Sequence, residues 1–334
     1  MARSILVTGG AGYIGSVVVE QLLALGHSVV VLDDLSRGHR AAVDSRAEFV
    51  QGGIADRRLL DDLLARRPCD ALVHLAAYAL VAESVAHPQM YFTNNVTGGQ
   101  VLLDAAVGAG VRRVIFSSSC AVYGHPPVIP IPEDAPRAPV NPYGETKLAF
   151  ERLLADYATR HGVGSISLRY FNAAGATARH GEDHDPETHL IPTVLQVALG
   201  RRPAVEVYGT DYPTPDGTCI RDYIHVGDLA AAHSDALRYL RDGGESLTLN
   251  CGYGRGFSVL EVIDAVKRAS GVDFRVDFAA RRPGDPTRIV AAADKARALL
   301  GWQPRLGDLS TIVAHALAWE RKRMALGSGQ AHAG

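Results

Sequence analysis

Ser4-Ile-Leu-Val-Thr-Gly-Gly-Ala-Gly-Tyr-Ile-Gly15, near the start of the 334-residue chain, determines the architecture of the segments that follow. An apolar run of strand length leads into a glycine-rich turn, and apolar residues then recur at helical spacing from Ile14 to Leu25. This order predicts a strand, a tight turn and a helix. The glycines would let the backbone approach a pyrophosphate, and the helix N-terminus would face the phosphates. The three glycines concerned are Gly9, Gly12 and Gly15.

A second β-branched run, Ser28–Leu32, ends in Asp33 and Asp34. An acid at this distance from the glycine turn would accept hydrogen bonds from an adenosine ribose. Asp33 favours NAD over NADP because a carboxylate would repel a 2′-phosphate, although Arg37 nearby keeps NADP open. The alternative is that the glycines only form a turn and that Asp33 caps the next one.

Strand-length apolar runs alternate with helical patterns in the first half of the chain, which predicts an α/β fold with a doubly wound parallel sheet. The strand ends near residues 8, 33, 75 and 117 should meet at one carboxyl edge, where such folds bind ligands. We expect an NAD-binding Rossmann domain over residues 1–175, to which the chain returns at about 219–242. Residues 176–334 would mainly form a smaller, mixed α/β domain that binds substrate.

The composition excludes several classes of protein. A formal charge of −2 provides no basic stripe for nucleic acid. No apolar run approaches the ~18 residues of a membrane span, and no secretion signal is visible, so we expect a cytoplasmic protein that does not bind membranes. The four cysteines are scattered and show neither a zinc pattern nor a disulfide framework. The histidines and acids of residues 180–189 show no known ligand spacing, so we expect a solvated or substrate-contacting loop and no metal.

Tyr143 and Lys147 lie four residues apart in a predicted helix reaching from Pro142 to about His161, so both side chains project from one face. The ammonium, together with the positive nicotinamide of oxidised NAD, would favour the phenolate. The pair could then take a proton from an alcohol while hydride passes to the cofactor. Ser119, at a strand end, could hydrogen-bond the same substrate oxygen. A chance surface pair of Tyr and Lys is the alternative interpretation.

Two arginines suit a diphosphate, because the guanidinium offers a planar fork of donors matched to phosphate oxygens. They are Arg221 and Arg282, and structural salt bridges are the alternative role for each.

The chain resembles the extended short-chain dehydrogenase/reductase family, within it the nucleotide-sugar epimerases, and the resemblance runs nearly end to end. The segment from 208 to 226 is far more specific than a glycine turn. The matching segments are Thr8–Gly15, Leu32–Ser36, Ser117–Gly124, Asn141–Gly144 with Lys147, Arg169–Asn172, Tyr208–Thr214, Asp216–Thr218, Arg221–Val226 and Arg281–Asp285.

This resemblance implies interconversion of UDP-glucose and UDP-galactose at the sugar C4, through a transient 4-keto intermediate and with tightly bound NAD. Other activities remain open: epimerisation of UDP-GlcNAc/UDP-GalNAc or of a UDP-pentose or uronate, a nucleotide-sugar 4,6-dehydratase, or a non-catalytic NAD-binding regulator. The resemblance also implies a homodimer formed through the helices at 88–110 and 142–161.

By position, the family implies Tyr143 as base, Ser119 as its hydrogen-bonding partner and Lys147 as the residue that contacts both Tyr143 and the nicotinamide ribose. The other implied cofactor residues are Gly9, Gly12, Tyr13, Ile14, Gly15, Asp33, Asp34, Ser36, Ile54, Leu75, Ala76, Ala77, Asn95, Ser117 and Phe171. The implied substrate residues are Ser119, Tyr143, Asn172, His189, Leu190, Val207, Tyr208, Arg221, Arg282 and Asp285. The chain departs from the family pattern at Gly53, Ala79 and His189, where aspartate, lysine and asparagine are common, and Ile289 occupies a position thought to gate N-acetylated sugars.

Overall fold

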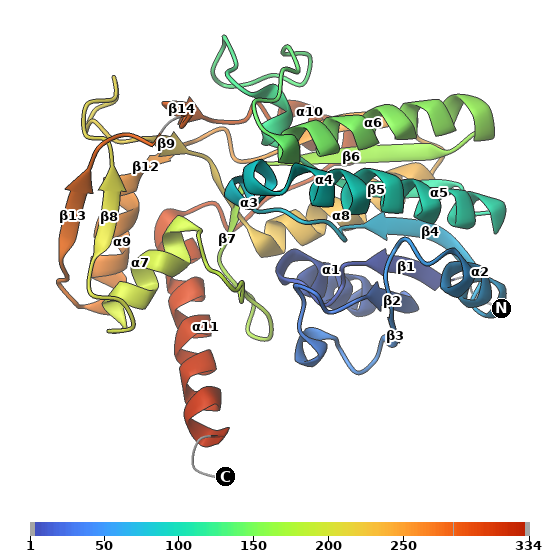
Figure 1. The fold of residues 1–334 in the computed structure, drawn as a ribbon, viewed down its shortest axis with the longest axis horizontal. Coiled ribbons are helices and arrows are strands. Elements are labelled where there is room, and N and C mark those ends of the chain that lie inside the picture. Colours follow the sequence, from blue (N-terminus) through green and yellow to red (C-terminus); the bar gives the residue numbers. More distant parts are fainter. Residues whose placement is uncertain (1–3, 283, 331–334) are drawn as a thin grey trace.

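A seven-stranded parallel sheet forms the centre of the molecule, which is described for residues 4–282 and 284–330 in a computed structural model (Figure 1). All six strand pairings are parallel, and the strand order is β11-β6-β5-β4-β1-β2-β3. The strands are β1 (Ser4–Thr8), β2 (Val29–Asp33), β3 (Glu48–Gln51), β4 (Cys69–His74), β5 (Arg113–Ser119), β6 (Gly164–Tyr170) and β11 (Leu247–Cys251). The predicted doubly wound parallel sheet is confirmed.

Helices cover both faces of this sheet, which explains why its central strands are continuous apolar runs. All five residues of β2 are buried, and Ile5, Leu6 and Val7 of β1 are fully buried. One face packs against α1 (Tyr13–Ala24) and α8 (Val226–Arg241). The other face packs against α2 (Arg57–Arg66), α5 (Gly99–Gly108) and α6 (Pro142–His161).

One edge strand of the sheet, β11, comes from a segment that we did not predict to join it. We expected the chain to return to the first domain at about 219–242, but β11 extends that return to residue 251. The strand pairs with β6 from Leu247 to Cys251. The rest of the predicted division into two domains stays a prediction.

A smaller lobe stands beside the sheet and has its own apolar cluster (Figure 1). Its helices are α7 (Leu190–Ala198), α9 (Val259–Ser270) and α11 (Leu309–Gln330), and its strands β8 (Val205–Tyr208) and β13 (Val276–Ala279) pair in parallel. Short strands link the lobes: β7 (Asn172–Ala174) with β10 (Tyr223–His225), and β9 (Ile220–Arg221) with β12 (Phe257–Ser258) and β14 (Arg288–Ile289). The remaining helices are α3 (Val81–Ala86), α4 (Pro88–Phe92) and α10 (Asp294–Leu300).

The helical pattern at 88–110 is interrupted in the structure. A π-helical turn at Thr93–Gly98 separates α4 from α5. By contrast, α6 has the predicted bounds, because Asn141 caps its first turn by accepting from the Gly144 amide at 2.9 Å and Gly162 ends it with φ +64°. Within the described residues, no helix combines the length and the apolar character that a membrane crossing requires.

Candidate active site

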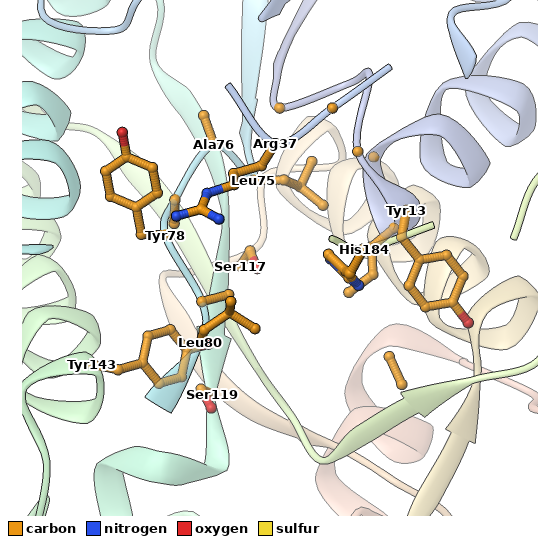
Figure 2. Close-up of a pocket in the computed structure, with 18 of the residues that line it drawn as sticks. Tyr13, Arg37, Leu75, Ala76, Tyr78, Leu80, Ser117, Ser119, Tyr143 and His184 are labelled. Carbon is orange, nitrogen blue, oxygen red and sulfur yellow. The ribbon is translucent and has the colours of Figure 1, made fainter. Parts of the chain in front are cut away.

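A cavity of about 440 Å³ lies at the carboxyl edge of the sheet, where the strand ends were expected to bring ligand-binding residues together (Figure 2). Its wall is formed by the glycine turn after β1, by the ends of β2, β4 and β5, and by the start of α6. Of the expected cofactor residues, it is lined by Gly9, Gly12, Tyr13, Ile14, Gly15, Asp33, Asp34, Ser36, Ile54, Leu75, Ala76, Ala77, Ser117, Tyr143, Lys147 and Phe171.

The three glycines of the turn serve different purposes. A Cβ at Gly15 would lie 2.0 Å from the carbonyl oxygen of Gly9, and Gly9 itself has φ +75°. The tight turn therefore requires both. A Cβ at Gly12 would meet nothing closer than 3.4 Å, and Gly12 faces the cavity as the N-cap of α1. Gly12 is thus available for close approach of a ligand, which fits a dinucleotide pyrophosphate.

Asp33 lies at the end of β2, on the cavity wall. Its carboxylate accepts hydrogen bonds from the amides of Ala11 (3.0 Å) and Leu35 (2.9 Å), and burial raises its pKa. Asp33 therefore ties β2 to the glycine turn, as the capping alternative suggested. Each carboxylate oxygen has a second lone pair, so the same side chain can also receive a ribose hydroxyl.

Ser119, Tyr143 and Lys147 converge at one end of the cavity, and Figure 2 shows Ser119 beside Tyr143. The Ser119 hydroxyl lies near enough to the phenol of Tyr143 to lower the pKa of that phenol. The Lys147 ammonium nitrogen lies 5.7 Å from the centre of the Tyr143 ring and donates to the Ser117 carbonyl at 2.7 Å. The i,i+4 spacing on α6 is therefore no chance surface pair: Lys147 is 3% exposed.

Burial dominates the electrostatics of this group. Burial raises the pKa of Tyr143 to about 12, although the hydrogen bond from Ser119 opposes the rise. Burial also lowers the pKa of Lys147 to about 7, against the favourable field of Glu151. Desolvation therefore dominates the pKa of both groups. That the Lys147 ammonium and the nicotinamide of oxidised NAD together favour the phenolate stays a prediction.

Gly144 and Asn95 position the beginning of α6. A Cβ at Gly144 would lie 2.6 Å from the Ala121 carbonyl oxygen, so glycine lets α6 approach the chain after β5 closely. Asn95 is not part of the cavity lining, in contrast to the expected cofactor contact. It bonds both the amide and the carbonyl of Tyr78 and donates to Thr146. Asn95 thus joins the cavity loop at Tyr78 to the first turns of α6.

A model of the NAD dependent epimerase/dehydratase family matches residues 5–252, which contain nearly all of the sheet and the Ser119–Tyr143–Lys147 group. The chain belongs to the NAD-dependent epimerase/dehydratase family. Among similar family members is the UDP-glucose 4-epimerase of Azospirillum brasilense, 50% identical over 95% of this chain and 92% of the relative.

Solved structures of the family agree with the fold. The UDP-glucose 4-epimerase of Brucella ovis in complex with NAD superposes with a TM-score of 0.92 at 47% identity, over 95% of this chain and 98% of that one. The enzyme of Bifidobacterium longum in complex with NAD+ and UDP gives a TM-score of 0.91 at 37% identity, over 96% of this chain and 98% of that one.

The expected substrate residues fall into two groups. Ser119, Tyr143, Asn172 and His189 line the cavity, whereas Leu190, Val207, Tyr208, Arg221, Arg282 and Asp285 do not. In the second group, the Arg282 guanidinium lies 4.8 Å from the centre of the Tyr208 ring and Nε is 2.9 Å from Oδ2 of Asp285. Arg221 donates to the Pro286 carbonyl at 2.8 Å. Burial raises the pKa of Cys120, a cavity residue, and the charge of Arg221 partly opposes this rise. The charge of Arg221 therefore acts at the cavity although its side chain does not line it.

Sequence reasoning missed two parts of the cavity wall. Arg37, considered only as a sign of NADP, forms an ion pair with Glu83 and lies 5.4 Å from the centre of the Tyr78 ring. Glu182 and His184 also line the cavity. The signal for this second part was present in the His/acid run at 180–189, but only the folded loop shows which of its side chains meet.

Proposed function

We propose that this chain interconverts UDP-glucose and UDP-galactose by NAD-dependent epimerisation at the sugar C4. The convergence of a serine, a tyrosine and a lysine at one end of a cavity that includes a dinucleotide-type glycine turn carries the proposal. Relatives of nearly the same length that are about half identical carry the name UDP-glucose 4-epimerase, which supports this substrate.

In the proposed reaction, NAD supplies the group that takes hydride from C4 and returns it to the other face. Tyr143 as phenolate accepts the proton of the C4 hydroxyl, and the Ser119 hydroxyl orients that oxygen. The sugar becomes a 4-keto intermediate. After the sugar has turned, Tyr143 returns the same proton to the oxygen, so protein and substrate regain their initial protonation.

The buried phenol sets the main energetic requirement of this reaction. A pKa of about 12 must fall toward neutrality before Tyr143 can act as a base at pH 7. Each pKa unit corresponds to about 1.4 kcal/mol. The proposed sources are the Lys147 ammonium, the hydrogen bond from Ser119 and the positive charge of an oxidised nicotinamide. Glu151 supports the first source because its carboxylate favours the protonated form of Lys147.

The remaining expected residues would divide between the two ligands. We propose that the turn residues and Asp33 hold NAD, while Asn172 and His189 hold the sugar diphosphate within the cavity. The group around Tyr208, Arg282 and Asp285 would bind the nucleotide end, since guanidinium groups suit phosphate oxygens and aromatic faces. Leu190 and Val207 would support these residues from α7 and β8.

Alternative activities make different demands on the chain. A 4,6-dehydratase needs acid and base groups after the serine-rich strand end, but Ala121 cannot titrate and burial raises the pKa of the Cys120 thiol to about 12. A non-catalytic regulator would need neither Tyr143 nor Lys147. Activity on N-acetylated sugars is a further alternative. Ile289, at the position that the resemblance implies gates these sugars, is buried and pairs in register with Arg221, one of the expected substrate residues.

Purified protein should convert UDP-galactose to UDP-glucose without added NAD. A 6-deoxy-4-keto sugar as product would instead support dehydration, and no conversion of any UDP-sugar would support a regulator. Tyr143→Phe should abolish turnover and retain bound NAD, because the ring is kept and the proton acceptor is lost. Full activity of this variant would exclude the proposed base.

We also propose a homodimer through the helices around 88–110 and 142–161. Exposed apolar side chains near the first of these helices, Val85 and Phe92, support an interface there. Light scattering should give twice the 35.6 kDa of one chain. A monomer at all concentrations would contradict the proposal.

A further inference from the structure

Four potential metal ligands meet in the loop between β7 and α7. Glu182, His184, Glu187 and His189 each contribute one nitrogen or oxygen atom, and these four atoms lie within 4.8 Å of one another. Three of these residues, Glu182, His184 and His189, also line the cavity. Figure 2 shows His184 beside Tyr13, on the side of the cavity away from Tyr143.

Oε1 of Glu182 is the centre of this group. It lies 2.6 Å from Nδ1 of His189 and 3.0 Å from Nδ1 of His184. Nδ1 of His189 also lies 2.9 Å from Oε1 of Glu187. A tetrahedral ion with bonds of about 2.0–2.2 Å holds its ligands roughly 3.4 Å apart, so shifts on the order of 1 Å would place an ion between these atoms.

Charge and burial favour a cation at this place. The carboxylate side chains of Glu182 and Glu187 are only 7% and 6% exposed. Two buried carboxylates require compensating positive charge. Without an ion, Glu182 and Glu187 raise the pKa of His189 well above its usual value, so its imidazolium supplies part of this charge. A divalent cation would displace that proton, and with both imidazoles neutral it would bring the total charge of the group to zero. A set of two imidazole nitrogens and two carboxylate oxygens suits Zn²⁺ and similar transition metals better than Mg²⁺ or Ca²⁺, which prefer oxygen ligands alone.

The loop that carries these ligands is held by the smaller lobe. The indole nitrogen of Trp319, on α11, donates to the Glu182 carbonyl at 2.9 Å, and Arg202, just after α7, donates to the Glu187 carbonyl at 3.2 Å. His189 immediately precedes α7, at the N-cap position of the helix. The backbone of the ligand-bearing loop is therefore tied to two helices, which is the rigid support that a metal site requires.

We propose that Glu182, His184, Glu187 and His189 form a binding site for a divalent transition-metal ion of the zinc type. The site lies in the cavity wall near Tyr13 and is separate from the Ser119–Tyr143–Lys147 group. Nδ1 of His189 would bind the ion, and its Nε2 would remain available to the sugar diphosphate. Its ion would fasten the 182–189 loop to the beginning of α7. The competing interpretation is a set of imidazole–carboxylate ion pairs that needs no metal.

Calorimetric titration of the chelator-treated, NAD-loaded full chain with Zn²⁺ tests the proposal. We expect one strong equivalent per chain, and at least tenfold weaker binding in Glu182→Gln and in His184→Asn. His161→Asn is the matched control, because His161 is an exposed histidine at the far end of α6 and its replacement should leave the affinity unchanged. Cys120→Ser should also bind normally, since burial keeps this cavity thiol protonated.

X-ray absorption of the Zn²⁺-loaded wild-type protein provides a readout that needs no variant. We expect only nitrogen and oxygen in the first coordination shell. Sulfur in that shell, the absence of a stoichiometric site, or equal affinity in wild type and His184→Asn would overturn the proposal in favour of the ion pairs. His184 has a side chain that is 30% exposed, so its replacement tests the ligand set even if Glu182→Gln does not fold.

Discussion

Replacing Gly12 with alanine should separate cofactor binding from folding. A Cβ at this position would meet nothing closer than 3.4 Å in the protein, and the backbone angles φ −84° and ψ 177° are open to any residue. Loss of glycine at an N-cap and the lower entropy of the unfolded chain have opposite effects of about 0.5–1 kcal/mol each. The free energy of unfolding without cofactor should therefore change by less than about 1 kcal/mol.

The same methyl group would project into the cavity where we place the pyrophosphate. If the methyl group breaks one or two hydrogen bonds to the charged diphosphate, the binding free energy of NAD weakens by about 3 kcal/mol. This corresponds to roughly 100-fold weaker NAD binding. The assay is the nucleotide released from acid-denatured protein, together with the Kd for NAD of the stripped protein and urea unfolding of the same sample.

Two further glycines serve as controls. Gly15→Ala places its Cβ 2.0 Å from the Gly9 carbonyl oxygen, so it should destabilise the stripped protein by about 3 kcal/mol or more. Gly108→Ala, at the exposed end of α5 with nothing within 4 Å, should be neutral or stabilising by up to about 1 kcal/mol and should retain NAD. Normal NAD affinity in Gly12→Ala would refute the placement of the pyrophosphate, and its unfolding without cofactor would refute our account of the turn.

Other perturbations test the catalytic group and its surroundings. Ser119→Ala removes one hydrogen bond to the phenol and should lower kcat about 10–100-fold with NAD content unchanged; an unchanged kcat would contradict its role. Glu151→Ala leaves the buried guanidinium of Arg169 without its partner at 2.7 Å, and should cost about 3–5 kcal/mol in urea unfolding; a loss below about 1 kcal/mol would contradict the importance of this pair. The free energy of unfolding should also fall from pH 7 to pH 5, because burial lowers the pKa of three histidines in the folded protein to about 3–4. In the unfolded chain these histidines have the usual pKa near 6.5 and take up protons over this range, so each contributes a loss of about 2 kcal/mol. A urea-unfolding free energy that does not change between pH 7 and pH 5 would contradict this. These histidines are His74, His225 and His233.

The sheet was predictable where local pattern and tertiary burial agree. The central strands are buried on both faces, so their sequences are short apolar runs, and α6 carries its own start and stop signals in Asn141 and Gly162. Strand β11 was missed because Leu247 and Thr248, at an edge of the sheet, are only half-buried and because its pairing with β6 lies some 80 residues away in the chain. No local pattern reports such a pairing.

The meeting of Ser119, Tyr143 and Lys147 in one cavity was predictable for a related reason. Strand ends and helix starts meet at one edge of a parallel sheet, so residues far apart in the sequence can be assigned to the same site once the strand order is known. Their electrostatics could not be assigned in this way, since burial raises the pKa of Tyr143 and lowers that of Lys147 by amounts that depend on the whole surrounding core. A residue pattern shows which groups meet, but not how much water remains around them.

Two interactions besides those of Ser119, Tyr143 and Lys147 shape the geometry of this site. Gly144 allows α6 to lie against the Ala121 carbonyl, and Asn95 joins Tyr78 to Thr146 on the same helix. Both position the first two turns of α6, from which Tyr143 and Lys147 project. The distance between the phenol and Ser119 therefore depends on packing at the helix start as much as on the reacting residues. This dependence explains why a tyrosine and a lysine four residues apart are a surface pair in one helix and line a cavity together in this one.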